Sequence, residues 1–334
     1  MKTILILALG VAMTGCASLS SFFSFGKQQQ QVAEVKKIEL PAMIYVEAKL
    51  KALPEATDTK EKAVALARKR LNQQVFQNYR NIDLVKRSEG ATAFELALTK
   101  AIYAEIPKPS LAQVIEEKPV QNPETGEVTA VVKVTRAEVI KSQMSRLYLL
   151  DGKLRQHLHV TGKGSKLTQL IALLPAAPVL MERRLLIADL EAMSGETLAL
   201  PNENLAKLME NQIERLIDQL VISLDAMTPE SAAFESGLKK ALAEKGFNMS
   251  ARKPDLTFKY FIELEGKEVI GDIEMLNDAS KTYGTVSGQY QQQAMESLAK
   301  ASMDELVRSM IGSMKAIIKA RHQEGIRKKD FGKT

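Results

Sequence analysis

The sequence Leu256-Thr257-Phe258-Lys259-Tyr260-Phe261-Ile262-Glu263-Leu264 decides the fold class, because apolar side chains occupy every second position along it. A period of two is typical of a β-strand with one buried face. Short turns follow, and the pattern predicts two more strands over residues 269–276 and 281–290. A helix over 292–320, with apolar residues on one face, would cover these strands. The C-terminal part is therefore expected to be α+β, with a helical layer on a sheet.

Before this strand the periodicity is helical. A broad apolar stripe predicts a helix over 202–227, which we expect to connect two domains. Pro229 follows Thr228 at a typical first helical position, and residues 234–247 continue with helical spacing.

The N-terminal half alternates between the two kinds of pattern. A strand is predicted over 44–50, a helix from 58 to about 80, and a second helix over 91–103. Two β-rich runs around Asn-Pro and Thr-Gly predict a hairpin, and a long helix begins at Arg136. The predicted pieces from the hairpin onward are strands 110–118 and 127–135 and helices from 136, over 167–174 and over 178–193.

Three segments of this half carry a family resemblance. They are KEKAVALARKRL at residues 60–71, VVKVTRAE at 131–138 and QLIALL at 169–174. In their β-α-β-β-α order they resemble the Lpp-twenty family of small membrane-associated bacterial lipoproteins, over about residues 40–195. The resemblance implies an envelope protein, as some members are linked to flagella or cell adhesion, and it implies no catalytic residues. The C-terminal part loosely resembles small α/β modules of envelope lipoproteins.

The N-terminus predicts export and lipidation. Lys2 precedes an apolar run over 4–13, and small residues follow, as in a secretory signal peptide. The run is too short for a transmembrane helix, which needs about 20 residues. Met13-Thr14-Gly15-Cys16 resembles the lipobox of bacterial lipoproteins, in which the cysteine is diacylated. Position 17 is Ala and not Asp, which by resemblance to enterobacterial sorting favours the outer membrane over retention in the inner one.

These patterns predict six consecutive segments. They are a signal peptide (1–15), a lipidated tether (16–39), an Lpp-twenty-like α+β domain (40–195), a connector helix (196–228), a C-terminal α+β domain (229–322) and a basic tail (323–334). The fold class is thus two small α+β domains joined by helices, after a lipidated flexible tether.

Composition argues against most catalytic chemistries. The 334 residues include one Cys, three His and no Trp, which disfavours a disulfide scaffold, a structural zinc site and a Cys/His nucleophilic pair. His157 and His159 diverge on a helix, so we expect solvated histidines and no metal. Glu116 and Glu117 point to opposite faces of a strand, and Asp189 and Glu191 have basic neighbours. We predict no catalytic residues, no cofactor and no enzyme; a hydrolase whose carboxylates meet only in three dimensions stays an alternative.

The positive charge gathers at the C-terminus. The chain carries a net charge of +6, and residues 319–334 hold six Lys and Arg residues against two acidic ones. Nucleic acid is therefore not expected as a partner, because its binders spread cations over a folded face. Arg327, Lys328, Lys329 and Lys333 are candidate contacts to an anionic surface such as lipid headgroups. The tail is expected to be frayed, and the alternative to surface contact is a solvated tail that only aids solubility.

The sequence therefore predicts a lipoprotein anchored to the outer membrane through Cys16 and facing the periplasm. We expect a non-enzymatic scaffold or assembly factor for an envelope machine, of flagellar, surface or cell-wall type, with an envelope protein or a second copy as partner. The alternative is a module that binds peptidoglycan, lipid or a small ligand. A deep polar pocket would favour the binding module, and an exposed apolar groove or sheet edge would favour the scaffold.

Overall fold

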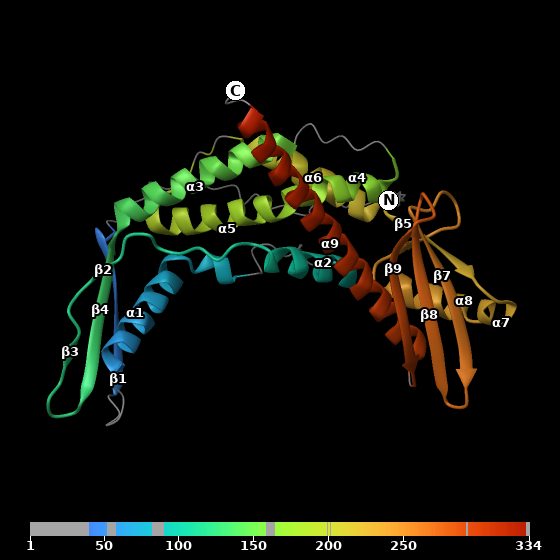
Figure 1. Ribbon diagram of the computed structural model, residues 1–334, viewed down its shortest axis with the longest axis horizontal. Coiled ribbons are helices and arrows are strands. Elements are labelled where there is room, and N and C mark those ends of the chain that lie inside the picture. The colour runs from blue at the N-terminus through green and yellow to red at the C-terminus, as the bar shows by residue number, and fades with distance from the viewer. Residues whose placement is uncertain are drawn as a thin grey trace, which may run out of the picture.

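The computed structural model describes residues 40–51, 58–81, 90–157, 164–198, 200, 202–291 and 293–331, with only the backbone of Arg80 and residues 324–331. The fold is α+β. Figure 1 shows an arch in which a bridge of helices joins two sheets at opposite ends. The strands are β1 (Met43–Lys51), β2 (Ile115–Glu116), β3 (Val120–Gln121), β4 (Glu127–Thr135), β5 (Val221–Ala226), β6 (Asn248–Met249), β7 (Leu256–Glu265), β8 (Glu268–Asn277) and β9 (Thr282–Tyr290).

The helices form the bridge and cover the sheets. They are α1 (Thr59–Val75), α2 (Ala93–Ala104), α3 (Arg136–His157), α4 (Lys166–Leu173), α5 (Ala177–Ser194), α6 (Glu203–Asp218), α7 (Pro229–Ala232), α8 (Glu235–Glu244) and α9 (Ala294–Phe331), with short 3-10 turns η1 (Asn78–Arg80) and η3 (Leu174–Ala176). Helices α3, α5 and α6 run across the top of the arch, and α9 climbs toward them from the C-terminal sheet.

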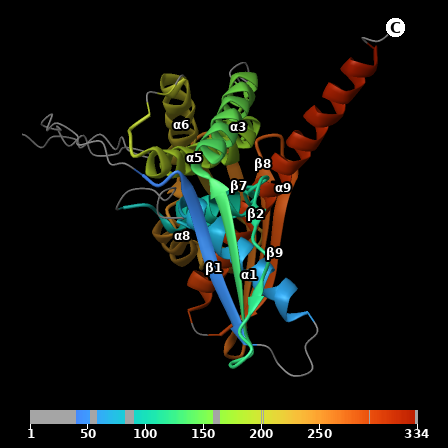
Figure 2. The same cartoon turned by 90° about the vertical axis from the view of Figure 1, so that its left-hand side faces the viewer.

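The N-terminal sheet is antiparallel, with strand order β1-β4-β2 and β3 also paired to β4. Its inner face carries Ile44 and Ala48 of β1 and alternate residues of β4, all buried under α1. Ala63 and Ala67 of α1 are fully buried, and their small side chains let the helix lie close to the strands. Figure 2 shows β1 and β4 in front of α1.

The predicted strand over 110–118 is mostly wrong, because only Ile115–Glu116 pairs with β4 in that stretch. The Asn72 side chain of α1 explains the difference. Its Nδ2 donates to the Pro109 carbonyl at 3.0 Å, and its Oδ1 accepts from the Leu111 N–H at 3.1 Å. These backbone groups therefore bind a helix and not a neighbouring strand.

The C-terminal sheet has the order β6-β5-β7-β8-β9, in which β5 is parallel to β6 and β7 and the others are antiparallel. The predicted strands over 256–264, 269–276 and 281–290 are thus confirmed. The predicted helix over 202–227 is wrong at its end, since α6 stops at Asp218 and Val221–Ala226 form β5. Asp255 fixes this strand: its Oδ2 accepts from the Val221 N–H at 3.0 Å, and its N–H donates to the Val221 carbonyl at 2.8 Å.

The closing helix is longer than predicted. Helix α9 runs to Phe331, so its backbone is helical where a frayed tail was expected. Residues 319–331 are mainly Lys, Arg, Gln, Glu and Ala, which are strong helix formers, and they include no Pro.

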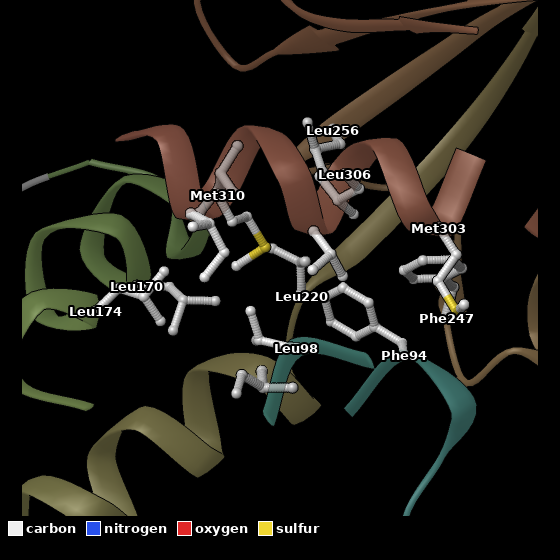
Figure 3. Packing of buried hydrophobic residues seen from close by; sticks show 14 of the residues in the cluster. Phe94, Leu98, Leu170, Leu174, Leu220, Phe247, Leu256, Met303, Leu306 and Met310 are labelled. Carbon is white, nitrogen blue, oxygen red and sulfur yellow. The ribbon is translucent and has the colours of Figure 1, made fainter. Parts of the chain in front are cut away.

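The largest apolar core joins α2, α4, α5 and α6 to the C-terminal sheet and α9. Figure 3 shows Phe94 and Leu98 of α2 beneath Met303, Leu306 and Met310 of α9. This core extends from Phe94 to Met314 and includes residues on both sides of the predicted domain limit at 195, so that division stays a prediction.

A close contact secures α2 against the end of α8. The Phe94 N–H donates to the Lys245 carbonyl at 2.9 Å. Gly246 has a φ of +100°, and a Cβ there would lie 2.2 Å from the Cβ of Thr92. Only glycine fits at this position, because a side chain would both clash and strain the backbone.

Candidate functional site

The residues that the sequence singled out for surface attachment lie at the margins of the structure. Cys16 and Lys333 fall outside the described residues. Arg327, Lys328 and Lys329 lie in the last turns of α9, where only the backbone is described. Their proposed contacts to lipid and to an anionic surface therefore stay predictions.

Helix α5 carries buried charges that the sequence analysis did not single out. The Arg183 Nε lies 2.8 Å from Asp151 Oδ1 of α3, and both side chains are less than 5% exposed. The other arm of the guanidinium, Nη1, lies 2.9 Å from Glu203 Oε2 of α6. One arginine thus joins three helices of the bridge.

The second carboxylate oxygen of Asp151 extends this network. It accepts from the Asn202 Nδ2 at 3.0 Å, and the Asn202 Oδ1 accepts from Arg155 Nη2 at 3.1 Å. Asn202 has a φ of 63°, a left-handed conformation that asparagine tolerates better than most residues. The network therefore also fixes the residue that precedes α6.

The same helix binds the end of the α1 segment through Asp189. This carboxylate is fully buried, and its Oδ1 accepts from the Asn78 N–H at 2.9 Å and from Asn78 Nδ2 at 2.8 Å. About two helical turns before Asp189, Glu182 of α5 forms a 2.6 Å ion pair with Arg146 of α3. Helix α5 is thus held by polar contacts to α3, α6 and η1.

Two buried carboxylates of the bridge have raised pKa values, Asp189 of α5 and Glu210 of α6. Burial raises the pKa of Glu210 to about 7, and Arg184, 3.3 Å away, offsets only part of that effect. Burial also raises the pKa of Asp189 to about 6, against the two hydrogen bonds from Asn78. Neither carboxylate is among the lining residues of the pockets beside Phe76, Leu98 and Val120. The contacts of Asp189 and Glu210 join α5 to η1 and to α6.

The carboxylate pairs noted in the sequence bind separate partners. Glu116 pairs with Arg68, and Glu117 pairs with Lys133 at 2.8 Å. Glu191 accepts from the Leu198 N–H at 3.1 Å, away from the Asn78 contacts of Asp189. In neither pair do the two carboxylates bind the same partner.

His157 is not solvated as expected, and His159 lies outside the described residues. His157 is half-buried, and its Nδ1 lies 2.6 Å from Arg321 Nη1 of α9. Burial and the neighbouring Arg321 lower the pKa of His157 to about 4. The expectation failed because α9 extends past residue 320 and reaches the end of α3. Within the described part of the chain, no three His, Cys, Asp or Glu residues come together as a metal site.

Strand β1 leaves one edge of the N-terminal sheet open. Among the described residues it pairs only with β4. The Arg136 N–H donates to the Ala42 carbonyl, so the even-numbered residues of β1 hydrogen-bond to β4. In an antiparallel ladder the backbone N–H and C=O groups of the alternate residues point away from the paired strand. Tyr45, Glu47 and Lys49 therefore direct their backbone groups to the open edge, where the Arg70 side chain contacts the Glu47 carbonyl at 3.4 Å.

Large apolar side chains are exposed on the outer face of this sheet, Tyr45 on β1 itself and Ile115 and Val120 on the far side of β4. Tyr45, Lys133 and Ile115 are directly opposite one another across three strands. Tyr45 is 68% exposed, Ile115 48% and Val120 of β3 67%. The outer face thus combines an open strand edge with apolar surface, which are features of protein contact sites.

Two pockets adjoin Phe76 at the end of α1. One of about 370 Å³ lies between residues 110–113 and the start of α3, and one of about 440 Å³ lies beside Tyr103 and Pro107. The first contains Gln143, whose side chain is buried.

The fold and these surfaces define an arch-shaped α+β protein with an ion-paired helical bridge. No described helix has the length and apolar character that a bilayer-spanning segment requires. No protein-family model and no curated protein matches the chain. Among solved structures, it is similar to the secreted protein HP1454 from the human pathogen Helicobacter pylori, with 10% identity and a TM-score of 0.42, over 81% of this chain and 97% of that one.

Removing the buried partner of Arg183 should strongly destabilise the bridge. Asp151→Ala leaves a buried guanidinium without its closest anion, which costs about 3–5 kcal/mol of unfolding free energy. Glu117→Ala removes an exposed ion pair and should change stability little. Urea unfolding measures both, and similar losses in the two variants would contradict the structural role of the buried pair.

The raised pKa of Glu210 predicts a loss of stability as the pH rises. The folded state holds this proton up to about pH 7, whereas the unfolded state releases it near pH 4.5. The stabilisation is therefore complete below pH 4.5 and is lost as the pH rises toward 7, by about 3 kcal/mol at most. Glu210→Gln should make the unfolding free energy fall by less between pH 4.5 and 7 than it does in the wild type, whereas the control Glu244→Gln should keep the wild-type pH dependence. An identical pH dependence in Glu210→Gln and the wild type would contradict the assignment.

Proposed function

We propose that this protein is a lipid-anchored envelope scaffold that adds a partner strand to the open edge of β1. The observation that carries the proposal is this edge, with the exposed side chain of Tyr45 on β1 itself and Ile115 two strands away on the same face. An extended segment can pair with such an edge through backbone hydrogen bonds, while pockets and apolar patches beside it select side chains. The partner is an envelope protein or a second copy of this chain.

The helical bridge supports a scaffold more than an enzyme. A scaffold holds two surfaces at a fixed separation, and ion pairs join α5 to α3 and α6 between the two sheets, with Arg183 and Asp151 both buried. Glu210, one of the two carboxylates with a raised pKa, takes part in these ion pairs, and Asp189 binds Asn78. We therefore propose a non-enzymatic role at a flagellar, surface or cell-wall structure.

The envelope location is proposed from the N-terminal sequence. Met13-Thr14-Gly15-Cys16 resembles a lipobox, and residues 40–195 resemble the Lpp-twenty family in their order of strands and helices. Three acyl chains on Cys16 would anchor the protein firmly, because each buried methylene contributes about 0.8 kcal/mol. Ala17 favours the outer membrane, with the folded part in the periplasm.

The lipid anchor predicts the outcome of cell fractionation. Cys16→Ser should move the protein from the membrane fraction to the soluble periplasmic fraction, because no acyl chain can then be attached. Ser18→Ala serves as a control that changes the neighbouring sequence without touching the thiol. Membrane association that is unchanged in Cys16→Ser would contradict lipid anchoring.

The open edge predicts a position-specific crosslink in living cells. A photo-reactive amino acid at Tyr45 should form an adduct of defined mass, whereas the same probe at Tyr148, an exposed tyrosine on α3, should not. Lys49→Pro removes one N–H that points to the open edge and leaves the β1–β4 ladder intact, so it should abolish the Tyr45 adduct. Adducts at both tyrosines, or an adduct that survives Lys49→Pro, would contradict strand addition.

A further inference from the structure

The outer face of α3 exposes two large apolar side chains next to each other. Tyr148 is 56% exposed and Leu149 is 52% exposed. Gly152 lies one turn further along the same face, and a Cβ at this residue would meet no atom within 4 Å. Figure 1 shows α3 above α5, on the convex side of the arch. These side chains therefore stand on an open surface of the folded chain.

Cations lie before and after the two apolar side chains. Lys141 precedes Tyr148 by about two helical turns, and Lys153 and Arg155 follow it by one to two turns. All three cations are exposed, whereas Glu138 is the one exposed acidic residue of this described helix. The outer face of α3 thus has an apolar centre and a net positive charge.

This combination suits a lipid surface better than a protein partner. A stable protein interface buries about 800 Å² on each partner, more than one tyrosine and one leucine can supply as an apolar centre. At a bilayer surface, apolar and tyrosine side chains enter the headgroup layer, and nearby Lys and Arg residues bind the phosphates of anionic lipids. The charge of this face is complementary to such a surface.

We propose that the outer face of α3 binds the surface of a bilayer that contains anionic lipids. Tyr148 and Leu149 enter the headgroup layer, and the three cations around them contact lipid phosphates. This face is separate from the basic residues at the end of α9, and the contact requires neither the β1 edge nor an acyl chain on Cys16.

The path of the chain is compatible with this contact. Arg136 is the first residue of α3, and its Nε donates to the Pro41 carbonyl at 2.7 Å. The segment that leads from Cys16 therefore joins the arch at the start of the helix that carries the proposed face. A lipid anchor would add to the affinity of α3 for the same bilayer.

The test uses the chain from residue 16 onward with Cys16→Ser, so that no acyl chain contributes to binding. The sequence contains no Trp, so Tyr148→Trp introduces a single fluorescent reporter. Its emission should shift to the blue with vesicles of phosphatidylglycerol and be quenched by brominated acyl chains, but not with vesicles of phosphatidylcholine alone. High salt should reverse the shift, because it screens the contact between the cations and the lipids.

A second reporter position shows whether α3 is the face that makes contact. Leu264→Trp lies near the turn between β7 and β8, at the foot of the arch in Figure 1, and Leu264 is 62% exposed. Its emission should not change with either kind of vesicle. An equal shift at both positions, or binding by the basic end of α9 without a shift at Tyr148→Trp, would overturn the proposal.

Charge variants test the cations at constant net charge. Lys141→Gln with Lys153→Gln should weaken sedimentation with phosphatidylglycerol vesicles by at least about tenfold, because each cation near such a surface contributes about 1 kcal/mol. The control, Lys239→Gln with Lys240→Gln on α8, loses the same charge from exposed positions and should bind almost as well as the parent chain. Equal losses in the two double variants would show that net charge alone governs binding, which would also overturn the proposal.

Discussion

The buried contact between Arg183 and Asp151 is the interaction on which the arch depends. Ions in a protein interior lose their hydration, so they persist only where partners surround them. Here the guanidinium is shared between α3 and α6, and the carboxylate also binds Asn202. This requirement fixes how the three helices meet, whereas apolar packing alone tolerates other arrangements. The separation of the two sheets follows from that geometry.

Much of the fold could be predicted because its patterns are local. The strand over 256–264, its two successors and the helices of the N-terminal half follow from the spacing of apolar residues. Val221–Ala226 could not be assigned in the same way, since Val221 and Leu224 also continue the helical stripe of α6. Their strand pairing depends on Asp255 and β7, which lie more than thirty residues further along the chain.

The candidate sites were less predictable than the fold, for a related reason. Glu182, Arg183 and Arg184 interrupt an apolar helix, and this sequence signal could have indicated buried ion pairs. The open edge of β1 depends on the order of the strands in the sheet. The apolar pattern of a single strand does not reveal that order. Gln143 stands among polar neighbours on α3, and its burial in the folded chain is not indicated by that local sequence. The prediction that His157 is solvated is wrong because its partner, Arg321, is distant in sequence and lies beyond the predicted end of α9.

Arg136 would carry force from the membrane into the helices if the chain is anchored at Cys16. Its N–H binds the Ala42 carbonyl, its Nε donates to the Pro41 carbonyl at 2.7 Å, and its Nη1 donates to the Met193 carbonyl at 3.0 Å. Met43 of β1 lies opposite Thr135, so a pull from the membrane would open the β1–β4 ladder from that end, one rung at a time. Arg136 links the start of β1 to α5, because it binds the carbonyls of Pro41, Ala42 and Met193. Tension on the anchor would therefore reach α3 and α5 before it separates β1 from β4.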